Sequence, residues 1–180
     1  MKSLLACILL LTGLFSLAQE TVKPSFRKYP VESTGCFLYL LSPPGEWTIE
    51  KSEDGSNVYT HSQEVGNFSY EIIAVKFAVP LSGVPRDEQE ALLISYLDFL
   101  KSQFGVTETI GYGKGQLLPG DETAIGVLDF WKGSNGSQTK LKGWINENYL
   151  AVLLVSGNSD PSDNAYTDLY LNGFRFSESQ

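Results

Sequence analysis

The sequence contains few of the side chains that carry most enzyme chemistry. Its 180 residues include one histidine and two cysteines, too few for the clustered Cys and His ligands of a zinc site. An acyl-transfer site needs a nucleophile and a base in contact. His61 is the only imidazole and Cys36 the only thiol once the first residues are set aside, and they could pair only if their strands are adjacent. Because Cys36 begins an apolar strand, we expect it to pack as a small hydrophobic side chain. We therefore expect no catalytic residues, no metal ion and no cofactor.

Positive charge is also scarce. The chain has 13 Lys+Arg against 21 Asp+Glu, a formal net charge of −8. The basic residues do not cluster, which excludes a nucleic-acid groove. The glycines from Gly111 to Gly115 lack the spacing of a phosphate-binding loop. Oxygen-bearing side chains between Asp160 and Asn164 are better explained as a helix N-cap than as calcium ligands.

Long apolar runs are missing, except at the start. Met1-Lys2-Ser3 is followed by an uncharged apolar run from Leu4 to Leu17, and small residues precede a cleavage position after Ala18. This pattern is typical of a secretory signal peptide, and the run is too short to span a bilayer. We expect a secreted or periplasmic protein with no membrane span once the signal peptide is removed. Cys36 would then be its only cysteine, so no internal disulfide can form.

The rest of the chain is long enough for one domain. Residues 19–34 are polar, include two prolines and show no clear period, which indicates a mobile leader or an edge segment. We expect a single domain over residues 35–176 and a short tail over residues 177–180. About 160 residues are enough to bury a core without disulfides.

Alternating apolar and polar residues indicate strands joined by tight turns. The segment from Phe68 to Val79 is apolar on both faces and should lie centrally in a sheet. Helical spacing predicts a long amphipathic helix over residues 86–104, and Asp160-Pro161 should begin a C-terminal helix over residues 160–173. Tight turns favour antiparallel pairing, so the sequence predicts an α+β fold with a mostly antiparallel sheet.

Three local features occur together with this order of elements. A strand runs into Pro-Pro-Gly-Glu-Trp at residues 43–47, a late strand has the aromatic-aliphatic sequence of residues 149–154, and the chain closes with Leu-Asn-Gly-Phe-Arg-Phe at residues 171–176. Over residues 35–176 the chain resembles the PsbP-like family, which includes many exported bacterial proteins. The resemblance implies an α/β/α sandwich and a role in binding or assembly. The family has no common active site that could be carried over.

These observations favour an exported, non-catalytic and monomeric protein that binds a protein or another envelope component. One alternative is a small-ligand or carbohydrate binder that uses the groove between the sheet and the long helix. Trp131, Trp144 and Tyr112 would be its contacts, because an exposed aromatic patch is typical of such sites. A hydrolase that uses carboxylates alone ranks last, since no spacing singles out a pair of acids.

Overall fold

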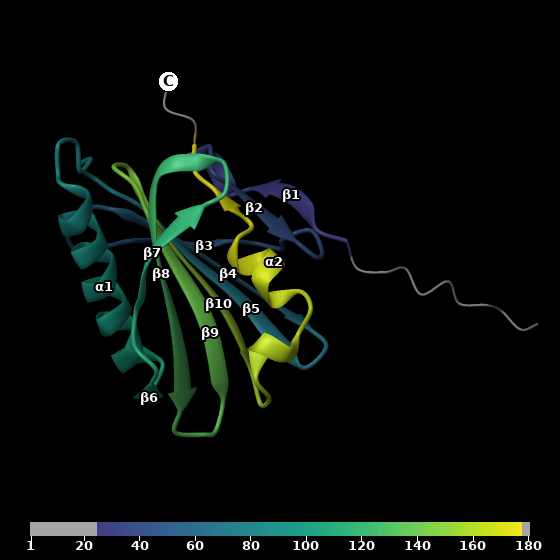
Figure 1. Ribbon diagram of the computed structural model, residues 1–180. Coiled ribbons are helices and arrows are strands. Elements are labelled where there is room, and N and C mark those ends of the chain that lie inside the picture. The colour runs from purple at the N-terminus through teal and green to yellow at the C-terminus, as the bar shows by residue number, and fades with distance from the viewer. Residues whose placement is uncertain (1–24, 178–180) are drawn as a thin grey trace, which may run out of the picture.

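The computed structural model describes residues 25–177, so the expected signal peptide and the last three residues of the predicted tail lie outside the described residues. The main element of the fold is one large antiparallel sheet (Figure 1). Its eight strands are β3 (Thr48–Lys51), β4 (Asn57–Val65), β5 (Phe68–Lys76), β6 (Val106–Thr109), β7 (Gly113–Leu118), β8 (Asp121–Gly133), β9 (Gln138–Ile145) and β10 (Tyr149–Gly157). They follow the order β3-β4-β5-β10-β9-β8-β6, with β7 paired to β8. With its two α-helices, this sheet confirms the α+β class.

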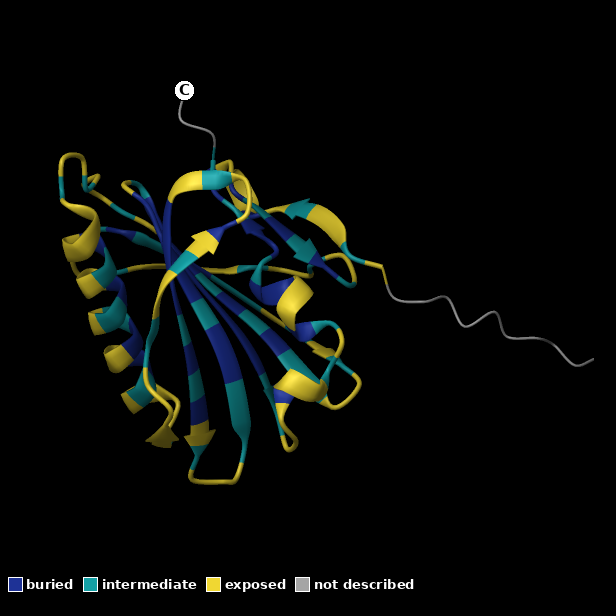
Figure 2. Cartoon of the chain, in the orientation of Figure 1, coloured by how far each residue is buried: buried dark blue, intermediate teal, exposed yellow. Residues whose placement is uncertain are grey.

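The helix α1 (Arg86–Gln103) forms where the apolar spacing predicts it. Pro85 precedes its first turn, and acidic residues in that turn suit the helix dipole. Its fully or nearly fully buried leucines, Leu93, Leu97 and Leu100, pack on one face of the large sheet. Figure 2 shows the outer side of the helix exposed and the side toward the sheet buried. Within residues 25–177, no helix is long and apolar enough to cross a membrane.

The opposite face of the sheet is covered by the two ends of the described chain. A small sheet of β1 (Arg27–Pro30), β2 (Phe37–Leu40) and β11 (Phe174–Arg175) lies there together with the short helix α2 (Thr167–Leu171). Part of the predicted polar leader is therefore strand β1, which pairs with β2. The two cores are separate, one between the sheet and α1 and one between the sheet and α2 with the small sheet.

The predicted C-terminal helix over residues 160–173 is wrong in length. Asp160 caps a single 3-10 turn over Pro161–Asp163 by accepting a bond from the amide of Ser162. The turn ends at Asn164, whose backbone is extended, and α2 begins again only at Thr167. The side chain of Asn164 donates to the hydroxyl of Tyr70 and its carbonyl oxygen accepts from Tyr166. These bonds compete with continuous helix, as asparagine side chains commonly do.

Helix α1 covers only part of its face of the sheet. Its main sheet contacts are with β8, β9 and β6, and Figure 1 shows it along that margin. Cross-strand pairs on the same face continue onto β4 and β5 as three successive pairs, Val58 with Val75, Thr60 with Ile73 and Ser62 with Glu71. The β4–β5 half of this face therefore has no helix of its own above it.

Candidate functional site

The aromatic residues predicted to bind a ligand do not share a surface. Trp131 is 3% exposed and Trp144 is fully buried. Trp131 belongs to the core beneath α1, whereas Trp144 belongs to the core beneath α2. Side chains alternate between the faces of a strand, and the pairing of β8 with β9 places these two on opposite faces. The prediction that Trp131 and Trp144 form an exposed aromatic patch is therefore wrong.

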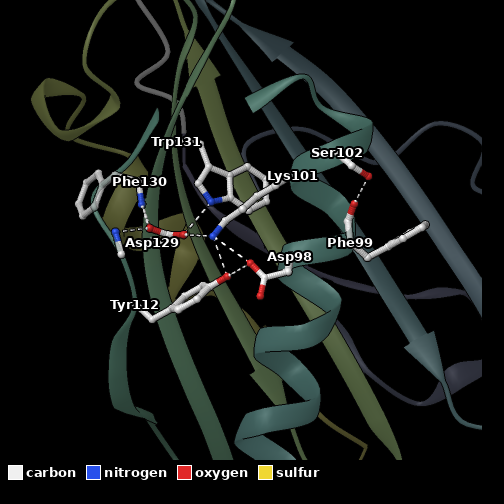
Figure 3. Close-up of polar contacts among 9 residues, drawn as sticks. Asp98, Phe99, Lys101, Ser102, Tyr112, Asp129, Phe130 and Trp131 are labelled. Atoms are coloured by element: carbon white, nitrogen blue, oxygen red, sulfur yellow. Dashed lines mark hydrogen bonds and ion pairs between the residues drawn. The ribbon is translucent and has the colours of Figure 1, made fainter. Parts of the chain in front are cut away.

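Tyr112 and Trp131 do meet, at a polar cluster between α1 and β8 (Figure 3). The carboxylate of Asp129 is completely buried and lies 3.3 Å from Nζ of Lys101. Its Oδ2 accepts a 2.8 Å bond from the indole of Trp131, and its Oδ1 accepts from the amides of Gly111 and Phe130. Nζ of Lys101 also donates to the hydroxyl of Tyr112 at 2.7 Å.

This cluster has the properties of a structural anchor. Each Asp129 oxygen is already paired, and the Tyr112 hydroxyl also donates to Asp98 at 2.5 Å. Burial alone lowers the pKa of Lys101, but its bond with Tyr112 and the attraction of Asp129 raise that pKa overall. A charged lysine that is held in this way ties α1 to β8 and leaves no free group for a ligand.

The structure separates Cys36 from His61. Cys36 is 1% exposed and lies near Lys76 at one end of the sheet, and burial raises the pKa of its thiol. His61 pairs across the strands with Ile72 and stacks on Trp47, with ring centroids 5.2 Å apart. Ile72 lies four residues from Lys76, about 13 Å along a strand. The thiol and the imidazole therefore do not form a catalytic pair.

Two pockets lie beside α1, over β4 and β5. One pocket of about 420 Å³ is lined by Val58, Val75, Phe77 and Leu150 of the sheet side and by Leu92 and Tyr96 of the helix. A second, of about 600 Å³, follows along the same strands and includes Thr60, Ile73, Glu71 and, at the end of the helix, Phe104. We call these two adjoining pockets the open groove. None of Trp131, Trp144 and Tyr112, the contacts suggested by the sequence for a groove between the sheet and the long helix, lines either pocket.

The open groove is mostly apolar at one end, where Asp54 also lines it, and acidic at the other. Glu71 receives one hydrogen bond, from Ser69, and no described residue forms an ion pair with it. Burial raises the pKa of Glu71, and the nearby charge of Glu64 adds to this. Glu46 also lines this end, and neither pocket is lined by lysine or arginine.

Two side-chain nitrogens of β4 are buried without a partner among the described residues, Nε2 of His61 and Nε2 of Gln63. These residues pair with Ile72 and Tyr70 of the core beneath α2, so their side chains lie on the face opposite Glu71. Beyond Thr60, β4 has no strand beside it, because β3 pairs only with the first half of β4. Buried polar atoms usually have partners, so the free edge of β4 is left with two unsatisfied side-chain nitrogens, on the face away from Glu71.

One signal in the sequence points to the groove. The apolar arc of α1 is wider than its buried face, because Leu92 is 42% exposed and Phe99 is 56% exposed. A helix that only covers a sheet needs the narrower stripe that Leu93, Leu97 and Leu100 provide. The extra apolar flank is therefore unexplained by packing within the described chain.

The comparisons with known proteins do not name the site. The chain matches none of the protein-family models and none of the curated proteins with which it was compared. Among residues 25–177, no three histidine, cysteine, aspartate or glutamate side chains lie close enough to hold a metal ion.

Proposed function

We propose that this chain is an exported, non-catalytic binding module of the cell envelope or extracellular space, and that it binds its partner through the open groove. The single observation that carries this proposal is the uncovered β4–β5 half of the sheet face, where apolar side chains and the unpaired carboxylate of Glu71 border one hollow. Solvent-exposed apolar hollows of this kind are typical of binding sites.

The proposal includes a PsbP-like α/β/α sandwich that acts as a monomer. Helices on both faces of one antiparallel sheet support this architecture. Export is supported by the apolar run that ends before Ala18, a pattern of the sequence alone. A binding role agrees with the separation of Cys36 from His61. The carbohydrate alternative loses its aromatic platform, because Trp131 and Trp144 are buried on opposite faces.

A neutral solvatochromic dye, Nile red, tests the groove directly. The dye should bind one site per chain and brighten, because Phe77, Leu92 and Tyr96 line the apolar end and are not fully buried. Tyr96→Ser should weaken binding severalfold. Ile110→Ser is the matched control, since Ile110 is 82% exposed and lies outside both pockets. Equal binding by both variants, or no binding by the unmodified chain, would refute the groove.

The non-catalytic part of the proposal needs a separate measurement. The chain should show no turnover on panels of ester, peptide and glycoside substrates. Hydrolysis that disappears in Cys36→Ala or His61→Ala would overturn this part of the proposal.

A further inference from the structure

The large sheet is wider than the helix that packs on it. Seven strands lie in one row. The six spacings between them, at about 4.8 Å each, give a face roughly 29 Å wide. A helix with its side chains is about 10–12 Å across, and α1 makes its main contacts with β6, β8 and β9. The remaining width over β4 and β5 corresponds to one more helix in the same layer.

The flank of α1 that borders this space is shaped for another helix. Leu92, Tyr96 and Phe99 follow each other at i, i+4 and i+7, the spacing of one helix face. Leu92 and Tyr96 line the groove, and the rings of Tyr96 and Phe99 lie 6.1 Å apart. Such a ridge of large apolar side chains packs into the groove of a neighbouring helix.

The charged residues along the groove indicate whether its partner is acidic or basic. Glu71 and Glu46 line its far end, Glu64 is near enough to affect the pKa of Glu71, and no basic residue lines either pocket. A cation in the partner would pair with Glu71 when this end is buried, whereas an apolar or acidic partner would leave its carboxylate unpaired at a cost. Charge complementarity therefore favours a basic partner.

A second copy of the chain fits these charges poorly. The chain has a net charge of −8, and α1 itself carries more acidic than basic residues. The six residues that would precede Ser25 in the expected mature chain are also an unsuitable occupant. Phe26 stacks against Tyr166 on the opposite face of the sheet, and those six residues include only one large apolar side chain, Val22.

We propose that the open groove binds an amphipathic helix of a partner protein, with its apolar face on Ile73 and Tyr96 and a lysine or arginine directed at Glu71. This inference rests on the proposed function and names the class of partner. The helix extends the layer that α1 begins, and helix-in-groove recognition of this kind is a common binding mode.

Three labelled probe peptides of about 16 residues test the inference by fluorescence anisotropy. The first is an amphipathic helix with apolar residues at i, i+3, i+4 and i+7 and lysines on its flanks. The second replaces those lysines with glutamate, and the third scrambles the first so that its apolar face is lost. We expect the first peptide to bind at least tenfold more tightly than the others, and more weakly as salt increases.

Two protein variants locate the contact. Glu71→Gln should weaken the basic peptide about tenfold, as expected for one partly buried charge pair, whereas Glu122→Gln, an exposed acid outside both pockets, should leave binding unchanged. Tyr96→Ser should weaken all binding, and Ile110→Ser should not. Amide chemical shifts that move in β4, β5 and α1 on peptide addition would give the same location without any variant.

The outcomes separate this inference from the proposed function. Equal binding of the basic and acidic peptides, equal binding of the scrambled peptide, or no effect of Glu71→Gln would overturn the inference, while Nile red bound beside Tyr96 would still support the groove. A dimer in light scattering that Tyr96→Ser dissociates would also overturn it, because a second copy would then fill the groove. Failure of both the dye and the peptides would overturn both proposals.

Discussion

Gly126 of β8 leaves the space that the indole ring of Trp144 fills on the neighbouring strand. The two residues pair directly across the strands, and a β carbon on Gly126 would overlap Cζ3 and Cε3 of the ring. Trp144 is held in this position by a 3.0 Å bond from its Nε1 to the carbonyl oxygen of Leu171 in α2. The glycine and the tryptophan thus join the sheet to the C-terminal helix.

Gly126→Ala should therefore destabilise the fold by about 1–3 kcal/mol, the usual cost of overpacking a core. Urea unfolding measures the loss, and near-ultraviolet circular dichroism should show a changed environment for the tryptophan. Gly45→Ala is the matched control, because no atom lies within 4 Å of the β carbon it would add. Equal unfolding midpoints for the two variants would contradict the packing role of Gly126.

The contact of Gly126 with Trp144 shows which features could not be predicted from the sequence. Alternation and turn residues are local, and they were sufficient for the α+β class and for the central position of β5 between β4 and β10. The burial of Trp144 depends on Gly126, which is far away in the sequence and becomes its neighbour only through strand register. An aromatic residue beside a hairpin therefore gives no sign by itself of whether it is exposed.

The sequence predicted the helix beside the open groove but not the residues that line the groove. The long helix was predicted from its apolar spacing, and the space beside it was suggested as a binding groove. The residues that line it come from β4 and β5, whose distance from α1 is set by the order of strands in the sheet. The C-terminal helix was overpredicted because side-chain bonds of Asn164 to Tyr70 and Tyr166 interrupt it, and Tyr70 is a distant partner.

Lys101 is expected to be essential for stability. Its substitution by methionine keeps the length and apolar stem of the side chain but leaves the buried carboxylate of Asp129 without its cation. Removal of one partner of a buried pair costs about 3–5 kcal/mol; Lys101 is itself partly exposed, so a loss of about 3 kcal/mol is expected. Urea unfolding at pH 7 measures it.

Asp98→Asn provides the comparison for this prediction. Asp98 also contacts Lys101 and Tyr112, but its side chain is 60% exposed, and exposed ion pairs contribute roughly 0–1 kcal/mol. The Lys101→Met variant should therefore be much less stable than Asp98→Asn. Similar losses in both would mean that the pair with Asp129 does not anchor the helix.

Glu71 should make the protein more stable in mild acid than at neutral pH. Burial raises its folded pKa above the ordinary value of 4.5, and Glu64 adds to this while Ser69 opposes it; its cross-strand neighbours, Ser62 and Leu154, are uncharged. The folded state then holds the proton more tightly than the unfolded chain. Its contribution to stability is present below pH 4.5 and is lost as the pH rises through the folded pKa.

Glu71→Gln removes this titration and tests its sign. The variant should gain stability relative to the unmodified chain at pH 7 and show a smaller difference at pH 4, as measured by urea unfolding at both values. Glu122→Gln is the control, because Glu122 is exposed. A Glu71→Gln variant whose advantage is greater at pH 4 than at pH 7 would reverse the argument.

The lowered pKa of His61 can be measured directly. Burial lowers its pKa below the ordinary value of 6.5, and a hydrogen bond with the backbone of Glu46 only partly offsets this. Because the chain has one histidine, a single imidazole signal in an NMR titration reports on it. The midpoint should lie below 6.5 in the folded protein and return to about 6.5 in concentrated urea.

The stability associated with His61 should have the opposite pH dependence to that of Glu71. The fold favours the neutral imidazole beside Trp47, so this contribution is present above pH 6.5 and is lost as the pH falls through 6.5 toward the lower folded pKa. His61→Gln should remove that loss, leaving a flatter stability curve between pH 5 and pH 7. A folded midpoint at or above 6.5 would contradict the burial of the imidazole beside Trp47.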